Sequence, residues 1–122
     1  MRITKTYRFE ASHLLPHHDG KCAKLHGHSY RLDVSVVGPL CVDGPKAGMV
    51  MDFGDLSSIV KEHVVDVLDH SHLNEVLPNP TCENLTIWMW GRLRSALPYL
   101  DEIVLWETET SRASVRRNDE AP

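Results

Sequence analysis

Two short segments carry histidines at a spacing that suits metal binding. The segment CAKLHGHSY, residues 22 to 30, places His26 and His28 two positions apart, and FEASH, residues 9 to 13, ends at His13. Side chains two residues apart point the same way on a strand but diverge on a helix, so this pair predicts a strand. If the two segments form an antiparallel hairpin, the three imidazoles can converge. Three histidines with an open fourth position are the ligand set of a catalytic zinc ion.

Cys22 opens the second of these segments and is compatible with three roles. As a fourth zinc ligand, it would close the site and make it structural. As a reactive thiol, it would lie beside the metal without binding it, and Lys21, Lys24 and the zinc ion would favour its thiolate. It is otherwise a small buried cysteine without chemistry, the commoner fate of cysteines.

The segment LDHSHLN supplies a second candidate group, Asp69 followed by His70. An aspartate that orients a histidine fixes its tautomer and raises its basicity, as in acid–base catalysis. A histidine that simply interacts with the dipole of a helix end is the alternative. Of the other histidines, His72 either joins this site or faces solvent, and His17 and His18 are expected to be exposed in a loop.

Glu107 lies within the apolar run IVLWET. A carboxylate on a mostly buried strand is costly unless it meets donors, and the NH and NH₂ groups of a guanine or pterin ring are one such pair. Alternatively, the strand lies at an edge and Glu107 pairs with a residue such as Arg112. Cys82 is a second candidate for a reactive thiol, because it lies in the first turn of a predicted helix, where the dipole lowers a thiol pKa.

The hydrophobic pattern predicts the elements that position these side chains. Residues 2–10 and 29–37 alternate between apolar and polar, as half-buried strands do. From Asp52 the apolar residues recur at three- and four-residue steps, which predicts an amphipathic helix that ends before the prolines of LPNP. Thr81 is placed to cap a second helix. The runs EIVLWETET and ASVRR predict two closing strands.

The expected buried stripes of the two helices are as follows: Leu56, Ile59, Val60, His63, Val64, Val67 and Leu68 in the first, and Leu85, Trp88, Met89, Leu93 and Ala96 in the second.

This order of strand, strand, helix, helix, strand, strand predicts an α+β domain. Its simplest form is a four-stranded antiparallel sheet with both helices packed on one face. The other face of the sheet would stay partly open, which invites oligomerisation. We expect a single domain over residues 1–118, followed by a frayed tail at 119–122.

The composition narrows the class of protein. The chain has 122 residues, of which 42% are hydrophobic and 25% charged, as in an ordinary soluble protein. Its net charge of -4 argues against nucleic acid as the main partner. No apolar run has the length that spans a membrane, and the first residues do not have the apolar centre of a signal peptide. The three cysteines show no paired spacing, which favours free thiols in a reducing cytoplasm.

Six motifs in this order, FEASH, CAKLHGHSY, GMVMDFGDL, LDHSHLN, NPTCENL and WET, closely resemble the 6-pyruvoyl-tetrahydropterin synthase family. The resemblance covers nearly the whole chain. The spacing Cys-x-x-x-His-Gly-His is similar to that of the 6-carboxy-tetrahydropterin synthase branch, whereas the animal pyruvoyl synthases have a longer gap.

The resemblance implies a tunnelling fold, in which sheets from several subunits surround a channel. It implies a homohexamer of two stacked trimers with active sites at subunit interfaces. It also implies roles for the motif residues: His13, His26 and His28 as zinc ligands, Cys22 as the thiolate base, Asp69 with His70 as a proton-relay pair, Glu107 as the pterin anchor, and Thr81 with Cys82 as pterin-binding residues. Cys82 stands where the family has a hydroxyl residue, so any side-chain hydrogen bond there is in question.

The implied activity is that of a zinc-dependent carbon–carbon lyase. It converts 7,8-dihydroneopterin triphosphate to 6-carboxy-5,6,7,8-tetrahydropterin, with release of acetaldehyde and triphosphate, in the 7-deazapurine pathway to queuosine. The alternatives are pyruvoyl synthase activity, which eliminates triphosphate only, and a zinc-stabilised pterin-binding module without turnover. A secondary-metabolite pathway is an alternative destination for the product.

Overall fold

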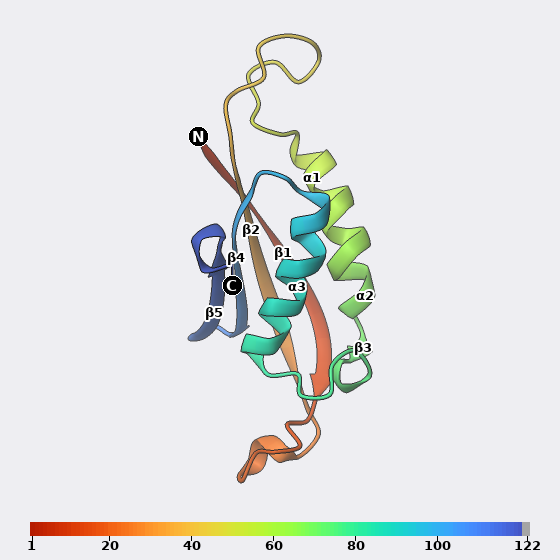
Figure 1. Cartoon of the computed structure of the whole chain (residues 1–122). Coiled ribbons are helices and arrows are strands. Elements are labelled where there is room, and N and C mark those ends of the chain that lie inside the picture. The colour runs from red at the N-terminus through yellow and green to blue at the C-terminus, as the bar shows by residue number, and fades with distance from the viewer. Residues whose placement is uncertain (121–122) are drawn as a thin grey trace.

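The computed structural model describes residues 1–120 and consists of one twisted sheet with helices on one face (Figure 1). The sheet has five strands in the order β3-β1-β2-β4-β5. The strands are β1 (Arg2–His13), β2 (His26–Val37), β3 (Ser71–His72), β4 (Leu100–Thr108) and β5 (Ser111–Arg116). The helices are α1 (Phe53–Val60), which continues through a π-helical turn (Lys61–Val65) into α2 (Asp66–Leu68), and α3 (Cys82–Ala96).

The α+β class and the packing of the helices on one face are confirmed, but the four-stranded sheet is wrong. The fifth strand is β3, whose two residues pair in parallel with Ala11 and Ser12 of β1. Two residues cannot show an alternating pattern, so the sequence gives no strand signal there.

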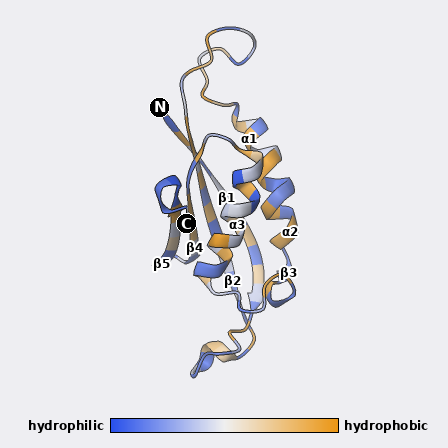
Figure 2. Cartoon of the chain, in the orientation of Figure 1, coloured by the Kyte–Doolittle hydropathy of each residue, from blue (hydrophilic) through white to orange (hydrophobic). Residues whose placement is uncertain are grey.

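The core lies between the sheet and the helices, as alternation along the strands dictates. Phe9 of β1 stacks on Tyr30 of β2, with ring centroids 4.9 Å apart, and both side chains are buried. Leu32, Val34 and Val36 continue this face on β2. Figure 2 shows hydrophobic and hydrophilic residues alternating along the helices. The buried apolar residues of the helices and of the strands belong to one core cluster.

The helix stripes are confirmed for seven of the twelve predicted positions. Ile59, His63, Trp88 and Ala96 are only half-buried, and in the second helix Trp90 is buried instead of Trp88. Leu56, Val60, Val64 and Leu68 are buried, but Val67 is exposed and Val65 is buried in its place. The π-helical turn at Lys61–Val65 shifts the register of the side chains behind it. A regular 3.6-residue period cannot anticipate that shift.

The expected tail is held at its first two residues. The Asp119 carboxylate accepts a hydrogen bond from the Arg116 amide at 3.0 Å, and Glu120 accepts from Trp90 Nε1 at 3.1 Å and Arg94 Nε at 2.7 Å. The frayed tail at 119–122 stays a prediction: Asp119 and Glu120 make these hydrogen bonds, and residues 121–122 lie outside the described residues. Within 1–120, no helix has the length and apolar character needed to cross a membrane.

Candidate metal centre and active site

The three histidines of the two segments meet at one end of the sheet. His13, the last residue of β1, lies directly opposite His26, the first residue of β2. His28 follows two residues later on the same side of β2, and the ring centroids of His26 and His28 are 4.9 Å apart. One nitrogen from each of the three rings lies within 4.8 Å of the other two. The predicted convergence is confirmed, because both strands extend to these histidines and pair there.

The hydrogen bonds of the rings leave the converging nitrogens free to bind a cation. His13 Nδ1 donates to the Pro80 carbonyl at 2.8 Å, and His26 Nδ1 donates to the Lys24 carbonyl at 2.7 Å. In a neutral ring the other nitrogen, Nε2, then carries a lone pair. These two Nε2 atoms face each other at 2.9 Å, and the buried Nε2 of His28 has no hydrogen-bond partner among the described residues.

Burial favours the neutral, metal-binding form of two of these rings. The His13 side chain is 1% exposed, and its pKa is lowered chiefly by burial, with the neighbouring His26 adding to the effect. Burial also lowers the pKa of His28. Glu107 opposes both shifts without reversing them. Lone pairs that face each other on neutral rings repel unless a cation lies between them, so the donor set fits a zinc ion bound through imidazole nitrogens.

Glu107 lies beside this cluster on β4. Its Oε2 atom is 4.0 Å from His13 Nε2, and its side chain is 25% exposed. The alternative, in which Glu107 points away and pairs with Arg112, is not what the structure has. The guanidinium of Arg112 lies over the Trp106 ring instead, 4.7 Å from its centroid. A half-buried carboxylate beside the histidines is thus available to a ligand.

Cys22 lies in a short 3-10 turn (Lys21–Ala23) of the loop between β1 and β2. Its thiol is half-buried, and its backbone carbonyl accepts a hydrogen bond from the Leu15 amide at 2.9 Å. Over residues 1–120, the cluster of potential metal ligands contains His13, His26 and His28 and does not include Cys22. Cys22 is thus close to His26 in the sequence, but its thiol does not belong to the cluster that could bind a metal ion.

Asp69 and His70 form a contact pair just after α2. His70 Nδ1 and Asp69 Oδ1 are 3.0 Å apart, and the His70 backbone has a φ of 60°. Backbone bonds to Glu10 fix the pair: the Glu10 amide donates to Asp69 Oδ1 at 2.9 Å, and the His70 amide donates to the Glu10 carbonyl at 2.6 Å. The amide of Glu10, followed by the His70 side chain, lowers the pKa of Asp69. The His70 side chain is 78% exposed.

Thr81 and Cys82 begin α3 next to the cluster. Thr81 is the N-cap of the helix, as predicted, and its Oγ1 accepts a hydrogen bond from the Asn84 amide at 3.1 Å. The expectation that the helix dipole makes Cys82 reactive is wrong. Burial, followed by the charge of Glu107, raises the pKa of the Cys82 thiol to about 11, so it is protonated at neutral pH. Its Sγ donates a long hydrogen bond to the Leu105 carbonyl at 3.5 Å.

A hollow of about 560 Å³ opens beside these groups, between β1, β2 and β3. It is lined by His28 and by both His70 and His72, and it includes Ser12 and Ser29. His72 is held by a 3.0 Å hydrogen bond between its Nδ1 and Ser12 Oγ. The sequence left the role of His72 open, and the structure places it at this hollow. As expected, His17 and His18 are exposed in the loop between β1 and β2.

Several supporting groups were missed because they act through the backbone or from the core. The carbonyls of Lys24 and Pro80 orient the rings, and the Asn74 side chain bonds both the amide and the carbonyl of Leu14, next to His13. Asn74 belongs to the LDHSHLN motif, which was the one signal available for it. Backbone partners have no signature in residue type.

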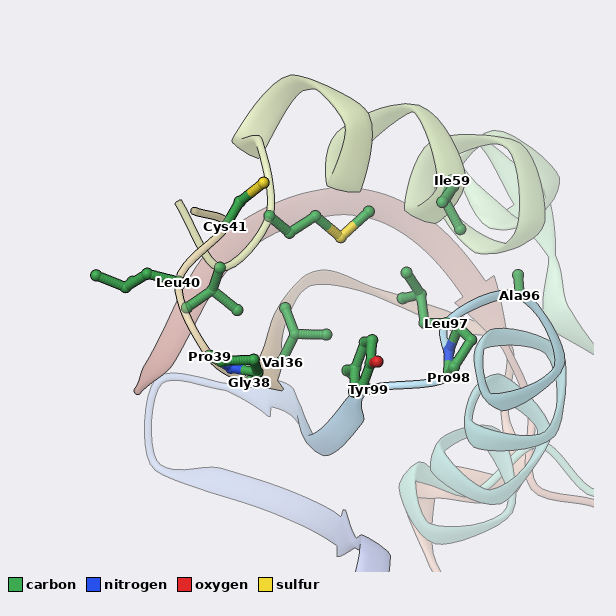
Figure 3. Close-up of a pocket in the computed structure, with 12 residues that line it drawn as sticks. Val36, Gly38, Pro39, Leu40, Cys41, Ile59, Ala96, Leu97, Pro98 and Tyr99 are labelled. Carbon is green, nitrogen blue, oxygen red and sulfur yellow. The ribbon is translucent and has the colours of Figure 1, made fainter. Parts of the chain in front are cut away.

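A second pocket, of about 480 Å³, lies at the opposite end of the sheet (Figure 3). It is lined mainly by apolar side chains such as Val36, Leu97 and Ile59, together with Cys41 and Tyr99. No cluster of metal-ligating or acid–base groups among the described residues lies there. The histidine cluster, not this pocket, is therefore the candidate for chemistry.

The family model for 6-pyruvoyl tetrahydropterin synthase matches residues 2–118. The chain belongs to this family. Curated relatives agree: a 6-carboxy-5,6,7,8-tetrahydropterin synthase of Synechocystis sp. is 44% identical, over 91% of this chain and 89% of its own. One of the same name from Haemophilus influenzae is 37% identical, over 90% of this chain and 94% of its own. The expected family is thus confirmed.

The solved structure of 6-pyruvoyl tetrahydropterin synthase from Caenorhabditis elegans has the same fold. It superposes with a TM-score of 0.82 over 95% of this chain and 94% of that one, at 26% identity. A dihydroneopterin monophosphate aldolase of Pyrococcus furiosus is a further relative, 38% identical over 87% of this chain and 89% of its own. Proteins similar to this chain therefore carry the names of different pterin enzymes. The residues of the site are needed to distinguish between these activities.

Proposed function

We propose that this chain is a zinc-dependent lyase of pterin metabolism. It would convert 7,8-dihydroneopterin triphosphate to 6-carboxy-5,6,7,8-tetrahydropterin and release acetaldehyde and triphosphate. The two relatives named 6-carboxy-5,6,7,8-tetrahydropterin synthase support this choice of reaction. The product would feed 7-deazapurine biosynthesis, with queuosine as the expected destination.

The observation that carries the proposal is the arrangement of the three histidines. Two of their rings donate Nδ1 protons to fixed carbonyls, and the third, His28, has a buried nitrogen without a partner. A metal ion satisfies all three rings together. When bound, zinc would supply Lewis acidity toward the oxygens of the substrate side chain.

The remaining groups would bind the pterin ring and move protons. Glu107 would accept hydrogen bonds from ring NH groups, which the low exposure of its carboxylate strengthens. The Cys22 thiolate would take a proton from the substrate side chain. His70, whose Nδ1 lies against the Asp69 carboxylate, would take or return a proton at its other ring nitrogen.

The released products separate this lyase from its nearest alternative. Purified protein incubated with dihydroneopterin triphosphate should form acetaldehyde together with triphosphate. Formation of triphosphate without acetaldehyde would instead identify a 6-pyruvoyl synthase, the name carried by a relative from Dictyostelium discoideum that is 40% identical over 75% of this chain.

A third possibility, a pterin-binding module without turnover, is separated by the Cys22→Ala variant. If Cys22 is the base, the variant keeps its zinc and loses activity. If Cys22 is a fourth ligand of a structural site, the variant loses zinc. The cluster contains His13, His26 and His28 without Cys22, which favours the first outcome.

The proposed assembly is a homohexamer of two trimers in the cytoplasm. Its support in this chain is the edge of β1, which β3 covers only at Ala11 and Ser12. Unpaired strand edges are templates for pairing with another chain. Large apolar side chains, among them Leu40, Val42 and Tyr99, are also exposed on the single chain.

A further inference from the structure

The face of the sheet opposite the helices carries three arginines in one row around a tryptophan. Arg8 of β1 lies directly opposite Arg31 of β2, Arg31 opposite Trp106 of β4, and Trp106 opposite Arg112 of β5. The guanidiniums of Arg31 and Arg112 lie 4.3 and 4.7 Å from the centroid of the Trp106 ring. The row therefore crosses four of the five strands.

This row has more positive charge than its contacts neutralise. Directly opposed like charges destabilise a pair of strands, so Arg8 against Arg31 is unfavourable without a counter-ion. Arg31 pairs with Asp33 at 3.2 Å, but its Nε is buried and has no hydrogen-bond partner within residues 1–120. Neither Arg8 nor Arg112 forms an ion pair with another described residue.

A small hollow of about 50 Å³ lies within the row. Arg8, Arg31 and Trp106 line it together with the hydroxyl residues Ser29 and Thr108. Guanidinium and hydroxyl donors around a hollow of this size suit a tetrahedral oxyanion. Ser29 also lines the larger hollow between β1, β2 and β3. The three histidines of the cluster are on the other side of the sheet, with Phe9 and Tyr30.

We propose that Arg8, Arg31 and Arg112 form a polyphosphate-binding site on the open face of the sheet. A triphosphate carries several negative charges on a chain of linked tetrahedral groups. Such a chain can follow a row of guanidiniums, each able to donate two hydrogen bonds to one phosphate.

Three carboxylates lie close to the row and reduce the positive charge that it offers to an anion. Asp33 is occupied by hydrogen bonds from Thr6 at 2.7 Å and from Trp106 Nε1 at 3.1 Å, in addition to Arg31. Glu10 accepts a hydrogen bond from Ser29 at 2.6 Å. Glu109 lines the small hollow itself. It should repel a phosphate, so removal of its charge should improve binding.

The direct test is calorimetric titration of the purified oligomer with inorganic triphosphate at low ionic strength. Because Arg8 makes no ion pair, Arg8→Gln should fold normally and bind triphosphate about tenfold more weakly, the effect of one lost charged hydrogen bond. Arg112→Gln should weaken it similarly, and Glu109→Gln should strengthen it. The matched control is Lys61→Gln, which removes one exposed positive charge from the helical layer and should change nothing.

Triphosphate also binds metals, so the titrations are repeated on protein stripped by a chelator. The differences between variants should persist there. The proposal is overturned if the parent binds no triphosphate, if Arg8→Gln and Arg112→Gln bind it as the parent does, or if Lys61→Gln loses as much affinity as Arg8→Gln.

Discussion

At the scale of single residues, the histidine cluster makes the sharpest prediction. His28→Ala removes the ring nitrogen that is buried without a partner. We expect the variant to remain a folded oligomer, because the stacked pair Phe9–Tyr30 and the rest of the core stay in place, and to bind zinc at least ~100-fold more weakly. Metal analysis after dialysis measures this loss.

The control for this prediction is His18→Ala, which removes an exposed histidine from the loop after β1. It should keep its zinc. Full zinc occupancy in His28→Ala would contradict the assignment of the cluster as the metal centre.

Glu107 is predicted to act on the pterin rather than on the metal. Its carboxylate lies 4.0 Å from His13 Nε2, too far to replace an imidazole ligand but close enough to face the same ligand molecule. Glu107→Ala should lower pterin affinity at least ~10-fold, the effect of losing a charged hydrogen bond, with zinc content little changed. Fluorescence titration with a pterin measures this, and Glu62→Ala on the helical layer is the control. Equal affinity in variant and parent would refute the anchor role.

The convergence of the three histidines was predictable, whereas the means of orienting them was not. Two histidines at alternate positions of a strand, opposite a third at the end of a neighbouring strand, must converge once the hairpin forms. The carbonyls of Pro80 and Lys24 that fix the tautomers come from loops, and the path of a loop has no periodic signal. The burial of Cys82 was equally hard to foresee. Its position at the start of a helix predicted a lowered thiol pKa, whereas burial raises that pKa.

At the scale of secondary-structure elements, the start of α3 connects stability with the site. Thr81 Oγ1 accepts the Asn84 amide, so Thr81→Ala should lower the free energy of unfolding by about 1 kcal/mol, and Thr81→Ser should restore most of it. Urea unfolding at one fixed protein concentration measures both, because the stability of the proposed oligomer would depend on protein concentration. If the alanine and serine variants are equally stable, the cap does not support the helix.

The elements themselves were predicted best where their period was long and regular. The alternation of β1 and β2 placed Phe9, Tyr30 and Leu32 in the core correctly. The errors arose where a local feature interrupts the period: β3 has two residues, and the π-helical turn exchanges Val65 for Val67 at the buried face. Tertiary contacts, not propensity, determine both features.

At the scale of the whole molecule, the exposure of the proposed relay pair leads us to expect that a second copy of the chain completes the site. The His70 side chain is 78% exposed and lies at an open hollow, where water screens electrostatic interactions. Proton transfer of the proposed kind is more effective in a site that excludes water. We therefore expect a neighbouring copy in the oligomer to cover His70, and His70 to serve the site of that neighbour.

Mixed oligomers test this arrangement. Cys22→Ala and His70→Ala should each be inactive alone. Because a mixed oligomer can join an intact Cys22 from one copy to an intact His70 from another, co-refolding the two variants should restore a measurable fraction of the acetaldehyde-forming activity. Mixing Cys22→Ala with His28→Ala is the comparison. Both residues belong to the segment of one chain that contains the loop before β2 and β2 itself, so this mixture should show no recovery. No recovery in the first mixture, in oligomers shown by mass spectrometry to contain both variants, would mean that each chain completes its own relay.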